Sequence, residues 1–195
     1  MIAWGNFAVL LFSTLLFLLF YVRSVSSVGR EKVVGPQAYR MCYYDRLVSG
    51  LFELIITVNF VLYHFFPLPV PLPVNFPWPW WVSLVIAALI GVPASLLMGI
   101  GLRDAGEEAL RPKKEHSMYA GIYKRLRHPQ AVGEAFLFPV MAIFLHSPSL
   151  TLSSLIYFPI FILLCYAEEQ DLLLRYGDRY AEYCKYTGAF WPKRR

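Results

Sequence analysis

Long uninterrupted runs of apolar residues are the dominant pattern of this chain. Three of them, at 2–22, 47–66 and 80–102, each have about the ~20 residues that a helix needs to cross a ~30 Å hydrocarbon core. Two shorter runs, at 129–145 and 150–167, are separated by the turn-like sequence HSPS. The pattern predicts a single-domain, all-α integral membrane protein with about five transmembrane helices. For the two shorter runs, a re-entrant pair is the alternative.

Composition supports a lipid environment, because 57% of the residues are hydrophobic and only 16% are charged. The first run could instead be a cleaved signal peptide, with the small residues at 24–27 as its cleavage site. A signal peptide carries its positive charges before the apolar run, whereas here the first basic residue, Arg23, follows it. We therefore interpret the first run as a membrane span.

The basic residues predict the orientation of the chain in the membrane. All 18 Lys and Arg fall in segments 23–46, 103–133 and 166–195, and none falls in the linkers at 67–80 and 146–149. By the positive-inside rule, the N-terminus is non-cytoplasmic and the C-terminus cytoplasmic. Topology and contact with anionic lipid therefore explain the net charge of +5, without a nucleic-acid partner.

Two connecting segments have compositions of their own. Prolines at almost every second position from Pro67 to Pro79 predict an extended strap, and the tryptophans beside it are typical of membrane-interface anchors. Alternatively, this linker is a PxxP motif that binds a partner protein. The segment 168–190 is amphipathic, and Gly177 divides it into two expected short helices that lie in the headgroup plane as a lid.

Candidate chemistry gathers around the expected cytoplasmic loop, 103–128. Pro129 is suited to the first position of a helix, so Arg127 and His128 precede a helix N-terminus, which favours carboxylate or phosphate. Glu168 and Glu169 lie at the cytoplasmic end of the last run, where buried acids usually face a polar site. An antiparallel hairpin places His128 beside Glu168. Alternatively, the basic residues anchor to lipid phosphates and the acids simply reach water.

Other classes of site find no support in the sequence. The three cysteines are scattered, so neither a disulfide framework nor a metal site is predicted. There is no P-loop, no His-Glu-x-x-His and no Ser/His/Asp set in a recognisable context.

The ordered series Gly121-x-Tyr123, Arg127-His128-Pro129, Gly133, Glu168-Glu169, Tyr176-Gly177, Tyr180, Tyr183 and Pro192 resembles the isoprenylcysteine carboxyl methyltransferase family over about the last 85 residues. The resemblance implies a membrane enzyme that transfers the methyl group of S-adenosylmethionine to the carboxylate of a prenylated cysteine, or to a related lipid-borne acceptor. It implies these cofactor-binding residues: Glu108, Glu115, His116, Ser117, Met118, Gly121, Tyr123, Arg127, His128, Pro129, Glu168 and Glu169.

The resemblance leaves the acceptor side open. Ala131 stands where family members usually have tyrosine, and Leu164 stands where eukaryotic members have an arginine that pairs with the substrate carboxylate. These departures leave the acceptor-binding residues unassigned. With five expected spans the chain is also smaller than the eukaryotic enzymes, which suggests a prokaryotic member. No general base is expected, because a prenylcysteine carboxylate is already ionised near pH 7. The alternatives are a phospholipid N-methyltransferase or another small membrane methyltransferase, a membrane sterol reductase, and a non-enzymatic scaffold.

Overall fold

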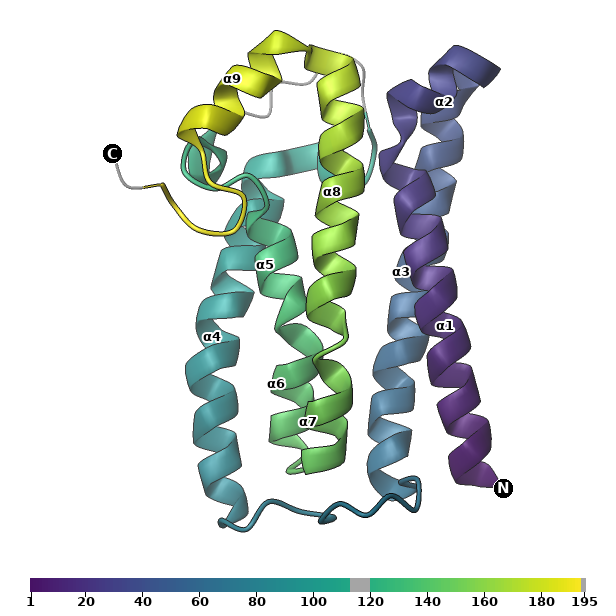
Figure 1. The fold of residues 1–195 in the computed structure, drawn as a ribbon, viewed down its shortest axis with the longest axis vertical. Helices are drawn as coiled ribbons and strands as arrows, with labels where there is room; N and C mark the ends of the chain where they lie inside the picture. Colours follow the sequence, from purple (N-terminus) through teal and green to yellow (C-terminus); the bar gives the residue numbers. More distant parts are fainter. Residues whose placement is uncertain (113–119, 194–195) are drawn as a thin grey trace.

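The computed structural model describes residues 1–112 and 120–193, and the fold within them is a bundle of helices (Figure 1). No strand forms in these residues; the one β-bridge joins Leu126 to Gly188. The helices are α1 (Ile2–Val25), α2 (Ser27–Val34), α3 (Gln37–Phe65), α4 (Trp80–Ala105), α5 (Pro129–Ala135), α6 (Leu137–Phe144), α7 (Pro148–Ser154), α8 (Tyr157–Tyr176) and α9 (Asp178–Tyr186), with short 3₁₀ helices η1 (Gly106–Ala109) and η2 (Gly121–Lys124). The predicted all-α integral membrane class is confirmed.

Four helical stretches of the described chain are long and apolar enough to cross a membrane: α1, α3, α4 continued through η1, and α7 with α8. The expected span at 129–145 is shorter. It forms α5 and α6, which meet at Phe136 and together run from Pro129 to Phe144. At ~1.5 Å per residue such a stretch falls short of a ~30 Å core. The structure thus has four full-length candidates where the sequence pattern predicts five.

The first half of the chain is an antiparallel pair, α1 and α3, connected through α2. Phe17 of α1 and Ile56 and Phe60 of α3 are buried in the main hydrophobic cluster, which also includes residues of α6, α7 and α8. Near the start of α1 and the end of α3, the Asn6 side-chain amide donates to the carbonyl of Asn59 at 3.1 Å. The pair therefore packs on itself and against the second half of the bundle.

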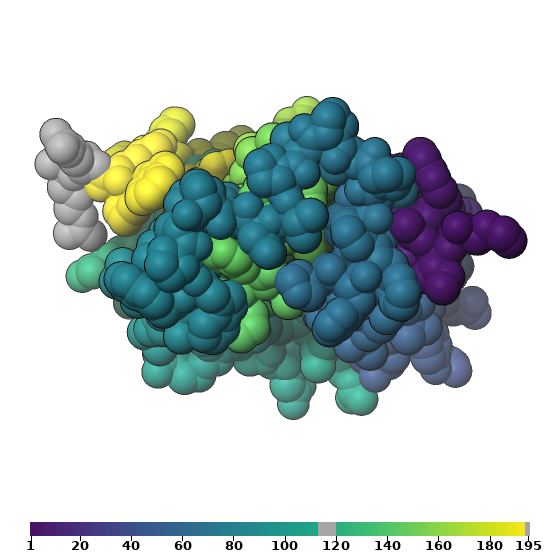
Figure 2. All heavy atoms as spheres, turned by 90° about the horizontal axis from the view of Figure 1, so that it is seen from below, coloured from purple at the N-terminus to yellow at the C-terminus, as the bar shows by residue number. Residues whose placement is uncertain are grey.

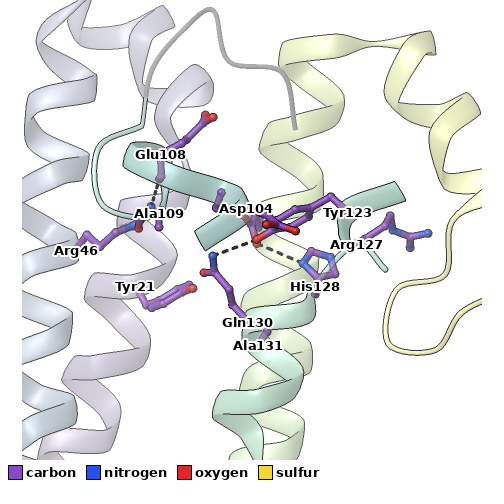
Figure 3. A pocket seen from close by; sticks show the side chains of 12 residues that line it. Tyr21, Arg46, Asp104, Glu108, Ala109, Tyr123, Arg127, His128, Gln130 and Ala131 are labelled. Carbon is purple, nitrogen blue, oxygen red and sulfur yellow. Dashed lines mark hydrogen bonds and ion pairs between the residues drawn. The ribbon is translucent and has the colours of Figure 1, made fainter. Parts of the chain in front are cut away.

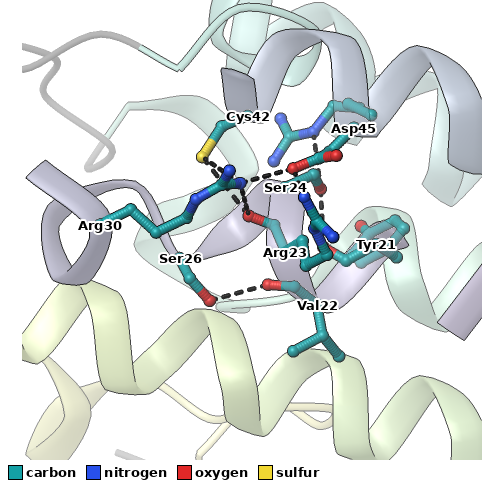
Figure 4. A network of polar contacts seen from close by, with 9 residues as sticks. Tyr21, Val22, Arg23, Ser24, Ser26, Arg30, Cys42 and Asp45 are labelled. Carbon is teal, nitrogen blue, oxygen red and sulfur yellow. Dashed lines mark hydrogen bonds and ion pairs between the residues drawn. The ribbon is translucent and has the colours of Figure 1, made fainter. Parts of the chain in front are cut away.

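Asp45 fixes the turn between α1 and α3 (Figure 4). Its carboxylate forms ion pairs with Arg30 of α2, at 2.5 Å, and with Arg23 of α1, at 3.4 Å. A second carboxylate, Asp171 of α8, accepts hydrogen bonds from the backbone N–H groups of Val28 and Gly29 at the start of α2. Such charge-assisted bonds at a helix start hold α2 to both halves of the molecule.

The proline-rich linker lies at the opposite end of the bundle. It runs without helix between α3 and α4, as the proline pattern predicts (Figure 1). Figure 2, which views this end, shows its atoms lying across the helix ends. Trp78 donates to Ser83 Oγ at 2.9 Å and Trp80 donates to the carbonyl of Phe144 at 3.1 Å. These bonds tie the linker and the start of α4 to the bundle.

Close backbone contact sets the position of α5. A Cβ atom at Gly133 would lie 2.5 Å from the carbonyl oxygen of Ala94 and 2.6 Å from the Cβ of Met98, so glycine allows α5 to approach α4 closely. From α5 the chain descends through α6, turns before Pro148, and returns through α7 and α8 (Figure 1). This antiparallel hairpin brings the start of α5 next to the upper part of α8.

The C-terminal segment differs in part from the expected pair of short helices. α8 continues past Ala167 to Tyr176 without a break, so the residues just after 167 extend this helix and form no separate one. Gly177, at φ +57°, ends α8, and α9 begins at Asp178, as the Gly-Asp pattern predicts. α9 lies across the end of the bundle (Figure 1), with Tyr180 only 1% exposed.

The fold brings the basic segments together at one end, where α2, α9 and the end of α4 lie, and puts the N-terminus and the linker at the other (Figure 1). We therefore expect a cysteine introduced at exposed Asn75 to react with a membrane-impermeant reagent in intact cells. A cysteine at exposed Glu182 should react only after permeabilisation. Labelling in a Cys184→Ser background checks this, and the reverse pattern at either position would contradict the orientation.

Candidate active site

A cleft opens at the end of the bundle that carries α2 and α9 (Figure 3). The space between its walls is about 630 Å³, including its open mouth. One wall comes from α1 and α3, and the other comes from α4, η2, α5 and α8. The lining residues are Tyr21, Arg46, Asp104, Ala105, Glu108, Ala109, Tyr123, Arg127, His128, Gln130, Ala131 and Glu168.

His128, the residue just before α5, lies between two carboxylates. Its Nε2 is 2.8 Å from Glu169 Oε1, and its Nδ1 is 3.4 Å from Glu168 Oε2. Because both ring nitrogens face acceptors, only the doubly protonated imidazolium can donate to both. The His128 side chain is 3% exposed, whereas that of Glu168 is 33% exposed and lines the cleft. Glu168 thus presents its carboxylate to a ligand while the histidine orients it.

The surroundings of His128 determine its charge. Burial lowers the pKa of the ring, but hydrogen bonds to Cys165, Glu168 and Glu169 outweigh it, so the pKa lies well above its ordinary value near 6.5. The contribution of this histidine to the free energy of unfolding is therefore complete below about pH 6.5. It is lost as the pH rises through the raised pKa.

We expect NMR titration of the His128 ring to give a midpoint above about 6.5 in the intact protein. Glu169→Gln should lower this midpoint, because it removes the closer carboxylate. A His128 midpoint at or below the ordinary value would contradict the ion-paired arrangement.

Arg127 faces away from the cleft interior in Figure 3, although part of it lines the wall. Its Nε is 2.8 Å from Glu169 Oε1, and its Nη1 donates to the carbonyl of Thr187 at 2.6 Å. The guanidinium thus joins α8 to the C-terminal tail and positions the carboxylate that contacts His128.

The helix start is less open than the sequence suggests. The backbone N–H groups of Arg127 and His128 donate to the carbonyls of Gly188 and Ala189, at 2.9 and 3.2 Å, so these two donors are already used by the tail. The first-turn N–H groups of Gln130 and Ala131 have no intrahelical acceptor, and both residues line the cleft. The N–H groups of the first turn are therefore the donors that this helix start offers to a ligand.

Tyr123 forms part of the same wall. Its hydroxyl donates to the carbonyl of Gly101 at 3.2 Å and accepts from Gln130 Nε2 at 3.0 Å (Figure 3). Burial, together with the nearby carboxylate of Glu168, raises the pKa of Tyr123 above its usual range. The tyrosine therefore remains neutral, and its hydrogen bonds hold the side chain in the cleft wall.

Gly121 shapes the loop that carries Tyr123. It has φ +55°, and a Cβ there would lie 2.0 Å from Asp104 Oδ2, so no larger residue fits without movement of Asp104. The same oxygen accepts a hydrogen bond from the backbone N–H of Ile122 at 2.8 Å. Asp104 thus holds η2 against the end of α4.

The opposite wall was not predicted from the sequence. Arg46 of α3 donates through Nη1 to the carbonyls of Glu108 and Ala109, at 3.1 and 2.8 Å (Figure 3). The Glu108 side chain forms an ion pair with Arg175 of α8 at 2.7 Å. The resemblance implies that Glu108 binds the cofactor. In the structure Glu108 lines the cleft, and its carboxylate holds η1 to α8 at the edge of the cleft.

The structure brings together most of the predicted residues that it describes. Glu108, Tyr123, Arg127, His128 and Glu168 line the cleft; Glu169 lies directly behind them; and Gly121 and Pro129 shape the backbone. Glu115, His116, Ser117 and Met118 lie outside the described residues. Ala131, the position where family members usually have tyrosine, also lines the cleft. The sequence did not predict Tyr21, Arg46, Asp104 and Gln130 as lining residues. Of these, Asp104 carried a usable signal, namely an acid near the end of an apolar helix.

Comparison with known proteins finds a family-model match that covers part of this site. Residues 102–179 match the family model described as phospholipid methyltransferase. That family and the isoprenylcysteine carboxyl methyltransferases belong to one superfamily of membrane methyltransferases, so the match supports a multi-pass membrane methyltransferase without confirming the isoprenylcysteine family. No curated protein and no solved structure matches the chain. The matched range contains the His128 corner but excludes α1 and α3, and hence Tyr21 and Arg46.

Proposed function

We propose that the protein transfers the methyl group of S-adenosylmethionine to a lipid-borne acceptor at the cytoplasmic face of the membrane. The observation that supports this most directly is the His128–Glu168 corner, which lines the cleft and falls inside the region that matches a methyltransferase family. The acceptor that we favour is the carboxylate of a prenylated cysteine.

The groups around the cleft fit the cofactor. S-adenosylmethionine carries a carboxylate, an ammonium group, a sulfonium and an aromatic base. The cleft offers first-turn N–H groups at Gln130 and Ala131, the carboxylates of Asp104 and Glu168, and the Tyr123 ring. Donors suit the carboxylate, acids suit the ammonium group, and a tyrosine ring attracts a cation.

The bound cofactor supplies an activated methyl group, and the protein needs to add little acid or base chemistry. His128 and Glu169 fix the direction of Glu168, and Arg127 with the tail closes one side of the cleft. These contacts align the reacting groups and exclude water, which otherwise solvates an ionised acceptor. The membrane concentrates a prenylated substrate, since each buried CH₂ contributes about 0.8 kcal/mol.

A second candidate acceptor is the amine of a phospholipid, which the description of the matching family favours. The two products differ in chemistry. A methyl ester is cleaved by base and releases methanol, whereas an N-methyl group survives. Incubation of the solubilised protein with methyl-labelled cofactor and each acceptor, followed by base treatment, separates them.

Calorimetry with S-adenosylhomocysteine on the detergent-solubilised protein tests the proposal first. We expect saturable one-site binding. Absence of binding in protein that keeps its helical content would refute the methyltransferase assignment and would favour a scaffold.

A further inference from the structure

Arg46 lies where two cavities meet. The cleft and a second cavity of about 370 Å³, lined mainly by residues of α1, α2 and α8, share Arg46, Glu108 and Glu168. Arg46 comes from α3, so it faces the His128 corner from the other half of the bundle (Figure 3). A group that enters between the halves thus meets this guanidinium.

The charge of Arg46 has no carboxylate partner within ion-pair distance among the described residues. The other well-covered arginines at this end all have one: Arg30, Arg127 and Arg175 are 20%, 12% and 6% exposed and pair with aspartate or glutamate. Arg46 is half-buried, and its nearest acceptors are neutral backbone carbonyls. A covered guanidinium without an anion is suited to bind one.

The hydrogen bonds of Arg46 leave donors available. Nη1 donates to the carbonyls of Glu108 and Ala109, and Nε is 3.5 Å from Ser24 Oγ. Within residues 1–112 and 120–193, no acceptor takes the two N–H groups of Nη2. The carbonyl bonds hold the guanidinium in place, so an anion would meet a donor pair that is already oriented.

We propose that Arg46 binds the anionic group of the lipid-borne acceptor, which is either the carboxylate that receives the methyl group or the phosphodiester of a phospholipid whose amine receives it. This inference rests on the proposed function. The carboxylates of Glu134 and Glu168 also interact with Arg46 electrostatically. Because these carboxylates repel an anion, we expect the anion to bind on the α3 side of the cleft. Arg46 lies outside the range that matches the methyltransferase family, so cofactor and acceptor are recognised by different parts of the chain.

The test compares Arg46→Gln with Arg40→Gln, which removes an exposed charge from the same helix. Methyl transfer is measured with S-farnesylcysteine and with dioleoylphosphatidylethanolamine vesicles. We expect Arg46→Gln to raise the KM for the accepted substrate about 10- to 100-fold, as for the loss of a charged hydrogen bond. Arg46→Lys keeps the positive charge, so it should raise the KM less than Arg46→Gln does. The affinity of Arg46→Gln for S-adenosylhomocysteine should stay within about twofold of the wild-type value. For Arg40→Gln, both this affinity and the KM should stay within the same range.

The outcomes separate the inference from the proposed function. Which of the two substrates responds to Arg46→Gln identifies the anion as carboxylate or phosphodiester. An equal loss of S-adenosylhomocysteine affinity would make Arg46 a structural clamp on η1 and would overturn the inference while leaving the methyltransferase function intact. Wild-type protein that binds S-adenosylhomocysteine but methylates neither substrate would also overturn it. Failure to bind S-adenosylhomocysteine would refute the proposed function itself.

Discussion

Replacing His128 by alanine is expected to weaken S-adenosylhomocysteine binding by ~1.5–3 kcal/mol, which is roughly 10- to 150-fold. The change removes the donor to both Glu168 and Glu169; Glu169 keeps its ion pair with Arg127, whereas Glu168 loses the imidazolium that orients it. Glu168→Gln should have an effect of similar size, because it removes the charge that faces the cleft while the shape stays the same. Calorimetry on each solubilised variant measures both effects.

Two matched variants control for general damage. His64→Ala changes a histidine at the far end of α3, and Glu182→Gln changes an exposed acid on α9. Neither residue lines the cleft, so both should bind with wild-type affinity. If His128→Ala and Glu168→Gln also bound normally, the corner would have only a structural or lipid-binding role.

Truncation after Arg175 is expected to abolish S-adenosylhomocysteine binding while the chain still inserts into the membrane. It removes α9 and the tail, and with them the carbonyl acceptors for the backbone of Arg127 and His128 and for the Arg127 guanidinium. It keeps nearly all of the four membrane-length stretches. Binding assays and protease protection of the inserted chain provide the two measurements.

A finer truncation locates the effect. A chain that ends at Tyr186 keeps α9 but loses residues 187–189, so it should still lose most of the affinity. A chain that ends at Pro192 keeps those acceptors and should bind normally. Unchanged affinity in the chain that ends at Arg175 would reduce the whole segment to a membrane anchor.

The contact between His128 and Glu168 was predictable because local rules act there. Pro129 begins a helix, a four-residue turn makes a hairpin, and the hairpin places His128 beside Glu168. The all-helical class followed equally directly from the apolar runs. The helix that carries the last apolar run extends beyond the run to Tyr176, because Leu172 is buried and Asp171 binds the start of α2.

The opposite wall could not be predicted, because no local pattern shows which face of α3 turns toward α5. Arg46 reads as one more cytoplasmic cation, and only packing of the two halves reveals that it faces the cleft. The tail is a similar case. Its carbonyl groups accept hydrogen bonds from the backbone N–H groups of Arg127 and His128, about 60 residues earlier in the sequence. Neither residue spacing nor helix propensity predicts such long-range contacts.

The proline-rich strap between α3 and α4 has a consequence for how such a protein diversifies. It joins, at the end remote from the cleft, one half that presents Arg46 to another that holds the His128 corner. An extended segment that tolerates length changes is a natural site for recombination. If Arg46 binds the acceptor as we propose, exchange of the residues before the strap should change the acceptor preference and leave the His128 corner unchanged.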